Sequence, residues 1–211
     1  MNTVKPISAT TLVLFGCAAA VAVAGLGCWL ASPSEPLDFD VWLRAEQADV
    51  GWIQGLPPVY SKLLPGGGNP EPENCQPRLW PSIRRISNQY HPGAAYEMRS
   101  TPRPDGSGLQ ATYDANGNLL RDGLAAGSAD RASPGSGWNP FLLLAHNNRD
   151  VIPFVRAAQL DGNAVHPTLF YRDLDAPILV VGEHLRAYSK VRPVFGPVRE
   201  VQPGTCAAAV H

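Results

Sequence analysis

A long apolar run opens the chain, and residues 6–31 carry no charged side chain. These roughly 26 residues are enough for a helix to cross a hydrocarbon layer of about 30 Å. The run also contains Ala22-Val23-Ala24, which fits the cleavage site of a secretory signal peptide. We therefore predict that residues 1–31 are a signal peptide or a transmembrane signal anchor, with lipidation of Cys17 or Cys28 as the weaker alternative. Each of these places the remainder outside the cytoplasm, secreted, periplasmic or held as a single-pass membrane-anchored protein.

Helical periodicity follows over residues 37–54, where apolar side chains recur at intervals near 3.6 residues and predict a short amphipathic helix. Residues 55–73 are rich in proline and glycine and include Gly66-Gly67-Gly68, so we interpret them as a linker or a loop. With the short polar stretch before them, residues 32–74 are assigned to a stalk, a short helix and a linker. The main domain then spans residues 75–206, and residues 207–211 form a tail.

Two strand signals occur within the main domain. Asn116-Gly117 predicts a hairpin that pairs residues 110–114 with residues 119–121, because a type I′ turn needs two positive φ angles. We expect Asp114 to order this turn. Residues 178–181 form a continuous, largely β-branched apolar run, which is typical of a buried strand.

Two short helices are predicted after a loop over residues 122–137, which we expect Asp130 to order. Residues 138–146 are apolar enough for a buried helix. Asp150 is the predicted N-cap of a helix over residues 151–160, with Pro153 in its first turn and Asp161-Gly162 at its end. The expected fold class is therefore α+β, a small irregular domain with short antiparallel strands, a few short helices and many loops.

Composition agrees with a turn-rich exported domain. The chain has 20 glycines and 21 prolines, which favour turns over long helices. Its formal net charge of −1 provides no general attraction to nucleic acid, and no nucleic-acid partner is expected. Cys75 and Cys206 are the two cysteines beyond the apolar run. In an oxidising compartment we expect them to form a structural disulfide.

Candidate chemistry is sparse in the sequence. His146 and Asp150 are four residues apart, which would place them on one helical face as half of a metal site that lacks a third ligand. We favour instead a buried histidine beside a capping aspartate. His91, Tyr113 and Asp114 could form an acid–base trio, but their spacing does not require it and hairpin tyrosines usually pack across strands. We predict neither a metal nor a cofactor.

Seven short motifs run through residues 90–154. They are Tyr90-His91-Pro92-Gly93-Ala94, Arg99-Ser100, the stretch from Gly108 to Tyr113, Gly127-Ser128-Ala129-Asp130-Arg131, His146, Asp150-Val151 and Phe154. In this order they resemble the AMOP domain, an adhesion-associated module of mucin-type and sushi-domain-containing cell-surface proteins. The resemblance covers residues 75–206 at most.

The chain departs from the AMOP pattern in its cysteines. One family cysteine falls on Glu97, one pair falls on Ala111-Thr112 and a second pair on Ala157-Ala158, whereas Cys75 resembles the cysteine that opens the domain. What the chain keeps is the framework around the missing cysteines. The residues that we expect to build this framework are His91, Pro92, Gly93, Gln110, Tyr113, Asp114, Asn116, Gly117, Gly127, Asp130, His146, Asp150 and Phe154.

The resemblance implies a non-enzymatic, exported or membrane-tethered binding or adhesion-type module, with an extracytoplasmic protein or a glycan as its partner. The alternative is an exported hydrolase or toxin-like effector that uses His91, Tyr113, His146 and Asp150. Geometry separates these two functions. An enzyme needs those side chains to converge within hydrogen-bond reach in a concave pocket, whereas a structural framework has them bonded to separate loops.

Overall fold

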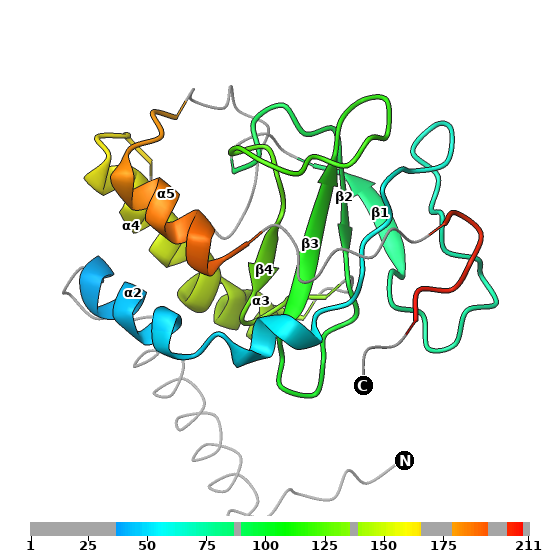
Figure 1. The fold of residues 1–211 in the computed structure, drawn as a ribbon, viewed down its shortest axis with the longest axis horizontal. Helices are drawn as coiled ribbons and strands as arrows, with labels where there is room; N and C mark the ends of the chain where they lie inside the picture. Colours follow the sequence, from blue (N-terminus) through cyan, green and yellow to red (C-terminus); the bar gives the residue numbers. More distant parts are fainter. Residues whose placement is uncertain (1–36, 87–89, 136–138, 166–178, 194–201, 209–211) are drawn as a thin grey trace, which may run out of the picture. The chain divides into compact units, whose positions relative to one another are not determined.

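The computed structural model describes residues 37–86, 90–135, 139–165, 179–193 and 202–208 (Figure 1). Its helices are α2 (Phe39–Ala48), α3 (Pro140–His146), α4 (Ile152–Leu160) and α5 (Glu183–Val191), with a 3-10 helix η1 (Gly51–Gly55) and a π-helical turn η2 (Asn147–Val151). Its strands are β1 (Ser82–Arg85), β2 (Tyr96–Arg99), β3 (Gly108–Tyr113) and β4 (Ser128–Asp130). These short elements confirm the predicted α+β class.

The four strands form an antiparallel sheet in the order β1-β2-β3-β4. Its register places Arg84 opposite Glu97 and Arg99 opposite Gln110. Because successive side chains of a strand point to opposite faces, these polar residues share one face of the sheet and the apolar residues between them share the other. The two faces therefore have different roles.

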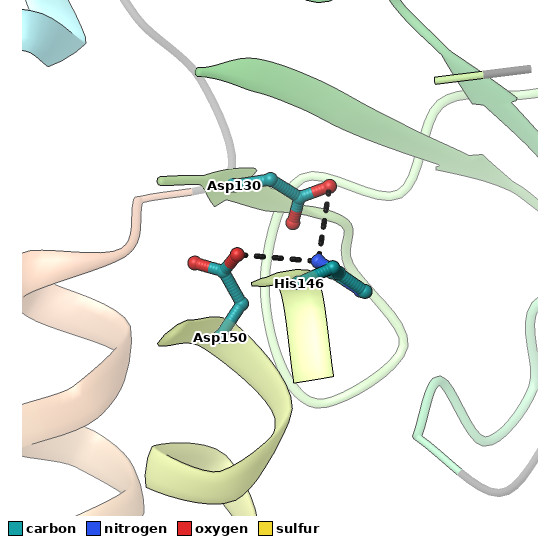
Figure 2. A group of neighbouring side chains, drawn as sticks. All are labelled: Asp130, His146 and Asp150. Atoms are coloured by element: carbon teal, nitrogen blue, oxygen red, sulfur yellow. Dashed lines mark hydrogen bonds and ion pairs between the residues drawn. The ribbon is translucent and has the colours of Figure 1, made fainter. Parts of the chain in front are cut away.

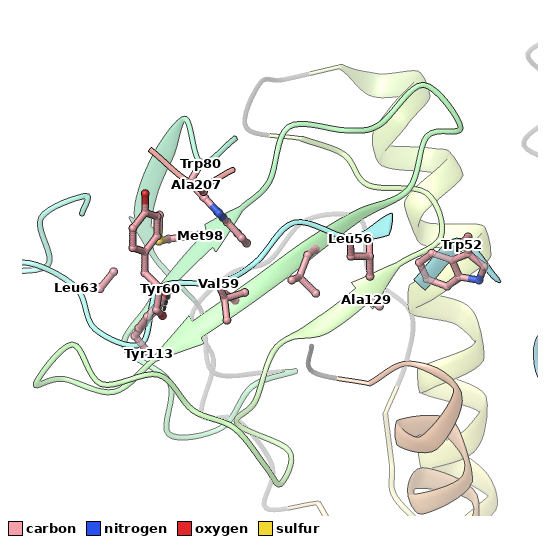
Figure 3. Packing of buried hydrophobic residues seen from close by; sticks show 12 residues of the cluster. Trp52, Leu56, Val59, Tyr60, Leu63, Trp80, Met98, Tyr113, Ala129 and Ala207 are labelled. Carbon is pink, nitrogen blue, oxygen red and sulfur yellow. Dashed lines mark hydrogen bonds between the residues drawn. The ribbon is translucent and has the colours of Figure 1, made fainter. Parts of the chain in front are cut away.

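The apolar face of the sheet packs against the chain segment that precedes β1 (Figure 3). The buried residues of this core are Trp52, Leu56, Val59, Tyr60, Leu63, Trp80, Met98, Leu109, Ala111, Tyr113, Ala129 and Ala207. Our interpretation of residues 55–73 as a linker is therefore wrong. Its apolar side chains occur at short intervals between the prolines, and they cover the sheet instead of separating two domains.

A disulfide joins Cys75 to Cys206, as predicted, across a sequence separation of 131 residues and a Cα–Cα distance of 5.4 Å. Cys75 is buried, at 1 % exposed. Beside the bridge, the Tyr60 hydroxyl donates to the Thr205 carbonyl oxygen at 2.7 Å. The C-terminal segment is thus attached to the apolar core by a covalent bond and by a hydrogen bond.

A second hydrophobic cluster is formed mainly by the helices, and Figure 1 shows α2, α4 and α5 on one side of the sheet. Its buried members are Phe39, Tyr90, Val151, Val155, Ala157, Ala158, Val165, Leu179, Leu185 and Tyr188. The helix predicted over residues 37–54 is present as two pieces. Asp38 caps α2 by accepting from the backbone N–H groups of Asp40 and Val41, and η1 follows after a break.

Residues 140–160 form one continuous helical segment, so Asp150 is not the N-cap that we predicted. It lies inside η2, where the Ile152 N–H donates to the Asn147 carbonyl oxygen. Pro153 explains this turn, because it has no N–H for a regular α-helical bond to Arg149 and a wider turn accommodates the loss. The predicted end of the helix is confirmed, since Asp161 is the C-cap of α4.

Three local predictions need correction. The helix before His146 is not buried, since Phe141 is 73 % exposed. Residues 179–181 form no strand and Val180 is 65 % exposed, while residue 178 lies outside the described residues. The turn after β3 is not type I′, because Gly117 has a positive φ of 78° and Asn116 does not. Asp114 orders it as expected, accepting from the Asn116 and Asn118 N–H groups at 2.8 Å.

Candidate functional site

A cavity of about 580 Å³ lies between the polar face of the sheet and the helices, which is the size of a small-molecule site. Arg84, Glu97, Arg99, Gln110, Ser128 and Asp130 line it from the sheet. His146, Asp150, Val151, Phe154, Tyr188 and Arg192 line it from the helical side. One wall is therefore charged, and part of the other is apolar.

The sheet wall is a row of ion pairs. Arg99 Nη1 donates to Asp130 Oδ2 at 2.6 Å, and Arg99 Nε lies 3.7 Å from Glu97 Oε1. Glu97 also accepts hydrogen bonds from Arg84 Nε and Gln110 Nε2. Buried charges are costly unless they are paired, so strand alternation places these residues where each charge meets an opposite one.

The centre of the helical wall is His146 (Figure 2), a buried residue at the end of α3. Its Nδ1 is 3.2 Å from Asp150 Oδ2 and 4.0 Å from Asp130 Oδ2. Figure 2 shows that Asp150 comes from the next helical turn and Asp130 from β4. The four-residue spacing in the sequence thus correctly predicts one contact, and the sheet supplies a second carboxylate.

Asp150 holds the loop after β4 against the helix. Its Oδ1 accepts from the Arg131 N–H at 2.8 Å and its Oδ2 from the Ala132 N–H at 3.0 Å. Arg192 Nη2 lies 3.5 Å from Oδ1, and the Tyr188 hydroxyl donates to the Asp150 carbonyl oxygen at 3.1 Å. Asp150 therefore caps a backbone segment, although not the helix for which we predicted it.

The two carboxylates beside His146 differ in acidity. Burial raises the pKa of Asp130, in spite of the nearby His146 and Arg99. Burial alone would also raise the pKa of Asp150, but the hydrogen bond with His146 and the guanidinium of Arg192 hold it below its ordinary value. Neighbouring acids whose pKa values are pushed apart are typical of acid–base sites.

Arg192 has a fully buried side chain that joins this site to α2. Its Nη2 lies 3.1 Å from Glu46 Oε1, and its guanidinium carbon lies 5.6 Å and 5.1 Å from the ring centres of Trp42 and Trp52. Burial raises the pKa of Glu46, and the charge of Arg192 opposes this. Since a desolvated guanidinium interacts favourably with aromatic faces, the two indole rings and two carboxylates stabilise one buried cation.

His91 is half-buried on the sheet side of the same cavity. It is positioned by the turn that Pro92 and Gly93 form, in which the Ala94 N–H donates to the His91 carbonyl oxygen and Gly93 has a φ of 92°. Its Nδ1 is 2.8 Å from the carbonyl oxygen of Ala126 and its Nε2 is 3.1 Å from Gln110 Oε1. His146 is buried, as we expected, whereas His91 is partly exposed.

Asp130, His146 and Asp150 could also be metal ligands, because one donor atom of each lies within 4.8 Å of the others. Asp130 is the third ligand that the sequence pattern lacked. Asp130 Oδ2 already accepts from Arg99, however, and both oxygens of Asp150 accept from backbone amides. A divalent cation would face two guanidinium groups here. The donor set therefore fits a hydrogen-bonded acid–base group better than a metal centre.

Of the four catalytic candidates named from the sequence, three line the cavity. Tyr113 does not, because it lies on the apolar face of β3, where its hydroxyl donates to the Tyr60 carbonyl oxygen. The trio of His91, Tyr113 and Asp114 is thus not assembled. Among the framework residues, Gln110 and Gly127 line the cavity, and Phe154 does so while packing edge-on against Tyr90 and Tyr188.

Sequence reasoning missed Glu97, Arg99 and Arg192 as members of the site. The polar–apolar–polar alternation of Glu97, Met98 and Arg99 was a usable signal, since it places two charges on one face of a strand. For Arg192 no local signal exists, because its partners come from residues more than 40 positions away in the chain.

Among the described residues, no helix combines the length and the apolar character required to cross a bilayer. The predicted N-terminal signal or anchor lies outside the described residues. Comparisons of the chain with protein-family models, with curated proteins and with solved structures found no match.

Proposed function

We propose that the domain is an exported hydrolase in which His146 is a general base that activates water. The observation that carries this proposal is the position of His146 Nδ1 between Asp150 and Asp130 in the wall of a cavity. A neutral imidazole has one ring proton, and here two carboxylates face Nδ1. The proton therefore resides on Nδ1, and Nε2 keeps the lone pair that a base requires.

Asp150 supports this role in two ways. It fixes the orientation of the ring, and as a carboxylate it stabilises the imidazolium that forms when His146 takes a proton. His146 removes a proton from water, the water oxygen bonds to the electrophilic carbon or phosphorus of the substrate, and the bond to the leaving group breaks. The imidazolium then returns the proton to the leaving group, which leaves the enzyme unchanged.

Replacement of the base tests this function. The purified full-length chain is assayed on ester, amide, glycoside and phosphoester reporter substrates. His146→Asn is expected to lower kcat/KM by about 10²–10⁴-fold, the usual contribution of a general base. His184→Asn is the matched control, because His184 also pairs with an aspartate, Asp161 at 2.9 Å, but does not line the cavity. Equal turnover in the two variants, or no turnover of any substrate by the wild type, would contradict the proposal.

A non-enzymatic binding module that resembles AMOP domains is the second candidate. The Cys75–Cys206 disulfide fits this module as well as it fits an exported enzyme, because such bonds are typical of secreted and cell-surface domains. Its partner would be an extracytoplasmic protein or glycan. Saturable binding to cell-envelope components that persists in His146→Asn, without turnover, would favour this function over the hydrolase.

Extracytoplasmic location is proposed on the same grounds. Non-reducing mass spectrometry of the chain, taken from the envelope and medium of its native host, tests it. We expect a bridged Cys75–Cys206 pair, and free thiols at both positions would contradict the location.

A further inference from the structure

Two oxygen atoms face the ring of His91, one at each nitrogen. They belong to the backbone carbonyl of Ala126 and the side-chain carbonyl of Gln110, at 2.8 and 3.1 Å. Carbonyl oxygens only accept hydrogen bonds, and a neutral imidazole has a single N–H to donate. The neutral ring can therefore satisfy one of the two contacts, whereas the imidazolium satisfies both.

The charge of the neighbouring Glu97 determines how the Gln110 amide is oriented. Burial opposes the charge of Glu97, but Arg99 and Arg84 hold its pKa below the ordinary value, so it is a carboxylate. It accepts from Gln110 Nε2. If the amide turned over, its oxygen would face this carboxylate. Because amide orientation is decided by the hydrogen-bond network, Gln110 presents its oxygen to His91.

Burial disfavours the protonated ring of His91, although the two oxygen contacts favour it. It lowers the pKa of His91, Arg99 acts in the same direction, and the charge of Glu97 opposes them. In the free protein at neutral pH the ring is thus neutral, and one of its oxygen contacts has no donor. An acceptor left without a donor in a partly buried position is costly. A negative charge in the cavity would remove the cost, because it would favour the protonated ring.

We infer that the cavity binds an oxyanion together with one proton, and that His91 takes up that proton. Glu97 and Arg99 act on the ring from β2. Other charged or titratable residues that line the cavity are Arg84 and Arg85 on β1, Asp122 in the loop after β3, Asp130 on β4, and His146, Asp150 and Arg192 on the helical side. This deepens the proposed function and rests on it for the substrate, because hydrolysis of esters and phosphoesters develops negative charge on oxygen. Anion binding itself requires no turnover and can be measured separately.

Ring-nitrogen NMR of the full-length chain, labelled with ¹⁵N-histidine, tests this inference directly. Sulfate and acetate are the probes, and they are titrated at about pH 6 and about pH 8, on either side of the usual histidine range. With anion bound, both nitrogens of His91 are expected to carry protons at a pH where the free protein has one. Binding should weaken by up to about tenfold for each pH unit above the midpoint of His91, by linkage. His184, which does not line the cavity, is the internal reference.

Two variants sharpen the result. His91→Gln identifies the ring signals and should remove the pH dependence of anion binding. Glu97→Gln keeps His91 but removes the carboxylate that fixes the orientation of the Gln110 amide. The amide can then turn and donate to the neutral ring, so both ring nitrogens have a partner without a second proton. The pH dependence of anion binding should therefore decrease. If His91→Gln fails to fold, the wild-type titration and Glu97→Gln still decide the question.

The outcomes are distinct. Proton-coupled binding of sulfate indicates a phosphoester-type ligand and proton-coupled binding of acetate a carboxylate-type ligand, and either supports the inference. It is overturned if neither anion binds, if binding is equal at the two pH values, or if His91 keeps one ring proton with anion bound. Proton-coupled anion binding in a chain that hydrolyses nothing would overturn the proposed hydrolase alone.

Discussion

At the scale of single residues, the role of Asp150 depends on several polar groups that contact its carboxylate from different parts of the chain. Two backbone N–H groups, the ring of His146 and the guanidinium of Arg192 surround its carboxylate, which is 3 % exposed. Hydrogen bonds to a carboxylate favour its charged form and oppose the cost of burial. The candidate base is therefore oriented by an ionised residue.

Asp150→Asn is expected to lower the free energy of unfolding by about 3 kcal/mol at neutral pH, because the buried Arg192 guanidinium loses one of its two carboxylate partners and keeps only Glu46. The native pKa of Asp150 lies below the ordinary value of 3.8. Its charge thus stabilises the fold above that value, and the effect is lost as the pH falls through the native pKa. Urea unfolding over a pH series measures the difference between wild type and variant, which should shrink in acid. A constant difference down to about pH 2 would contradict this linkage.

At the scale of elements, each of the short segments depends on a neighbour. The turn after β3 approaches the segment before β1 closely, and the Leu63 N–H donates to the Gly117 carbonyl oxygen at 2.8 Å. α5 is likewise joined to α2 through Arg192 and Glu46. These contacts connect the N-terminal part of the domain to the turn after β3 and to α5.

Gly117→Ala is expected to destabilise the fold by about 1 kcal/mol more than Gly66→Ala. Both glycines have positive φ angles, 78° and 75°, so both substitutions are strained. An added Cβ at Gly117 would lie 3.1 Å from Leu63 Cβ, whereas at Gly66 nothing lies within 4 Å. Chemical denaturation of the two variants isolates the contact, and equal losses would show that the turn can move away from Leu63.

Arg192→Met is expected to cost about 3–5 kcal/mol, because it removes the guanidinium that pairs with the buried Asp150 and the partly buried Glu46. Adding Glu46→Gln should recover part of this loss, since it removes one of the unpaired charges. A double-mutant cycle measured by thermal or urea unfolding gives the coupling between the two residues. Additive losses would mean that the contact between α5 and α2 does not depend on this ion pair.

At the scale of the whole molecule, stability comes from two hydrophobic clusters and one covalent bond. The cluster on the apolar face of the sheet includes Ala207, next to Cys206, so the bridge and the core hold the same segment. A disulfide that closes a long loop restricts the unfolded chain more than one that closes a short loop. This disulfide is therefore a major contributor to the free energy of unfolding of a domain of this size.

Replacing both cysteines, Cys75→Ser with Cys206→Ser, is expected to lower the free energy of unfolding by about 4–5 kcal/mol, from the loop-closure entropy of 131 residues. Denaturation with and without dithiothreitol measures the effect. The reductant should destabilise the wild type and leave the double variant unchanged. A wild type that is insensitive to complete reduction would contradict the prediction.

The sequence alone was sufficient for features that depend on neighbouring residues. These include the α+β class, the contact of His146 with Asp150 across one helical turn, the ordering of the turn by Asp114 and the end of α4 at Asp161. Beyond the N-terminal apolar run, Cys75 had one possible partner, Cys206. Such features follow from spacing, local hydrogen bonding and simple counting.

Only the tertiary structure decided which residues share the cavity. Asp130 reaches His146 because β4 pairs with β3, and Arg192 reaches Asp150 because α5 packs on α4. It also placed Tyr113 in the core rather than in the site, since that depends on which face of β3 is covered. The physical reason is the same in each case. Strand register and helix packing determine the neighbours of a buried charge. Neither can be predicted from the residues that adjoin that charge in the sequence.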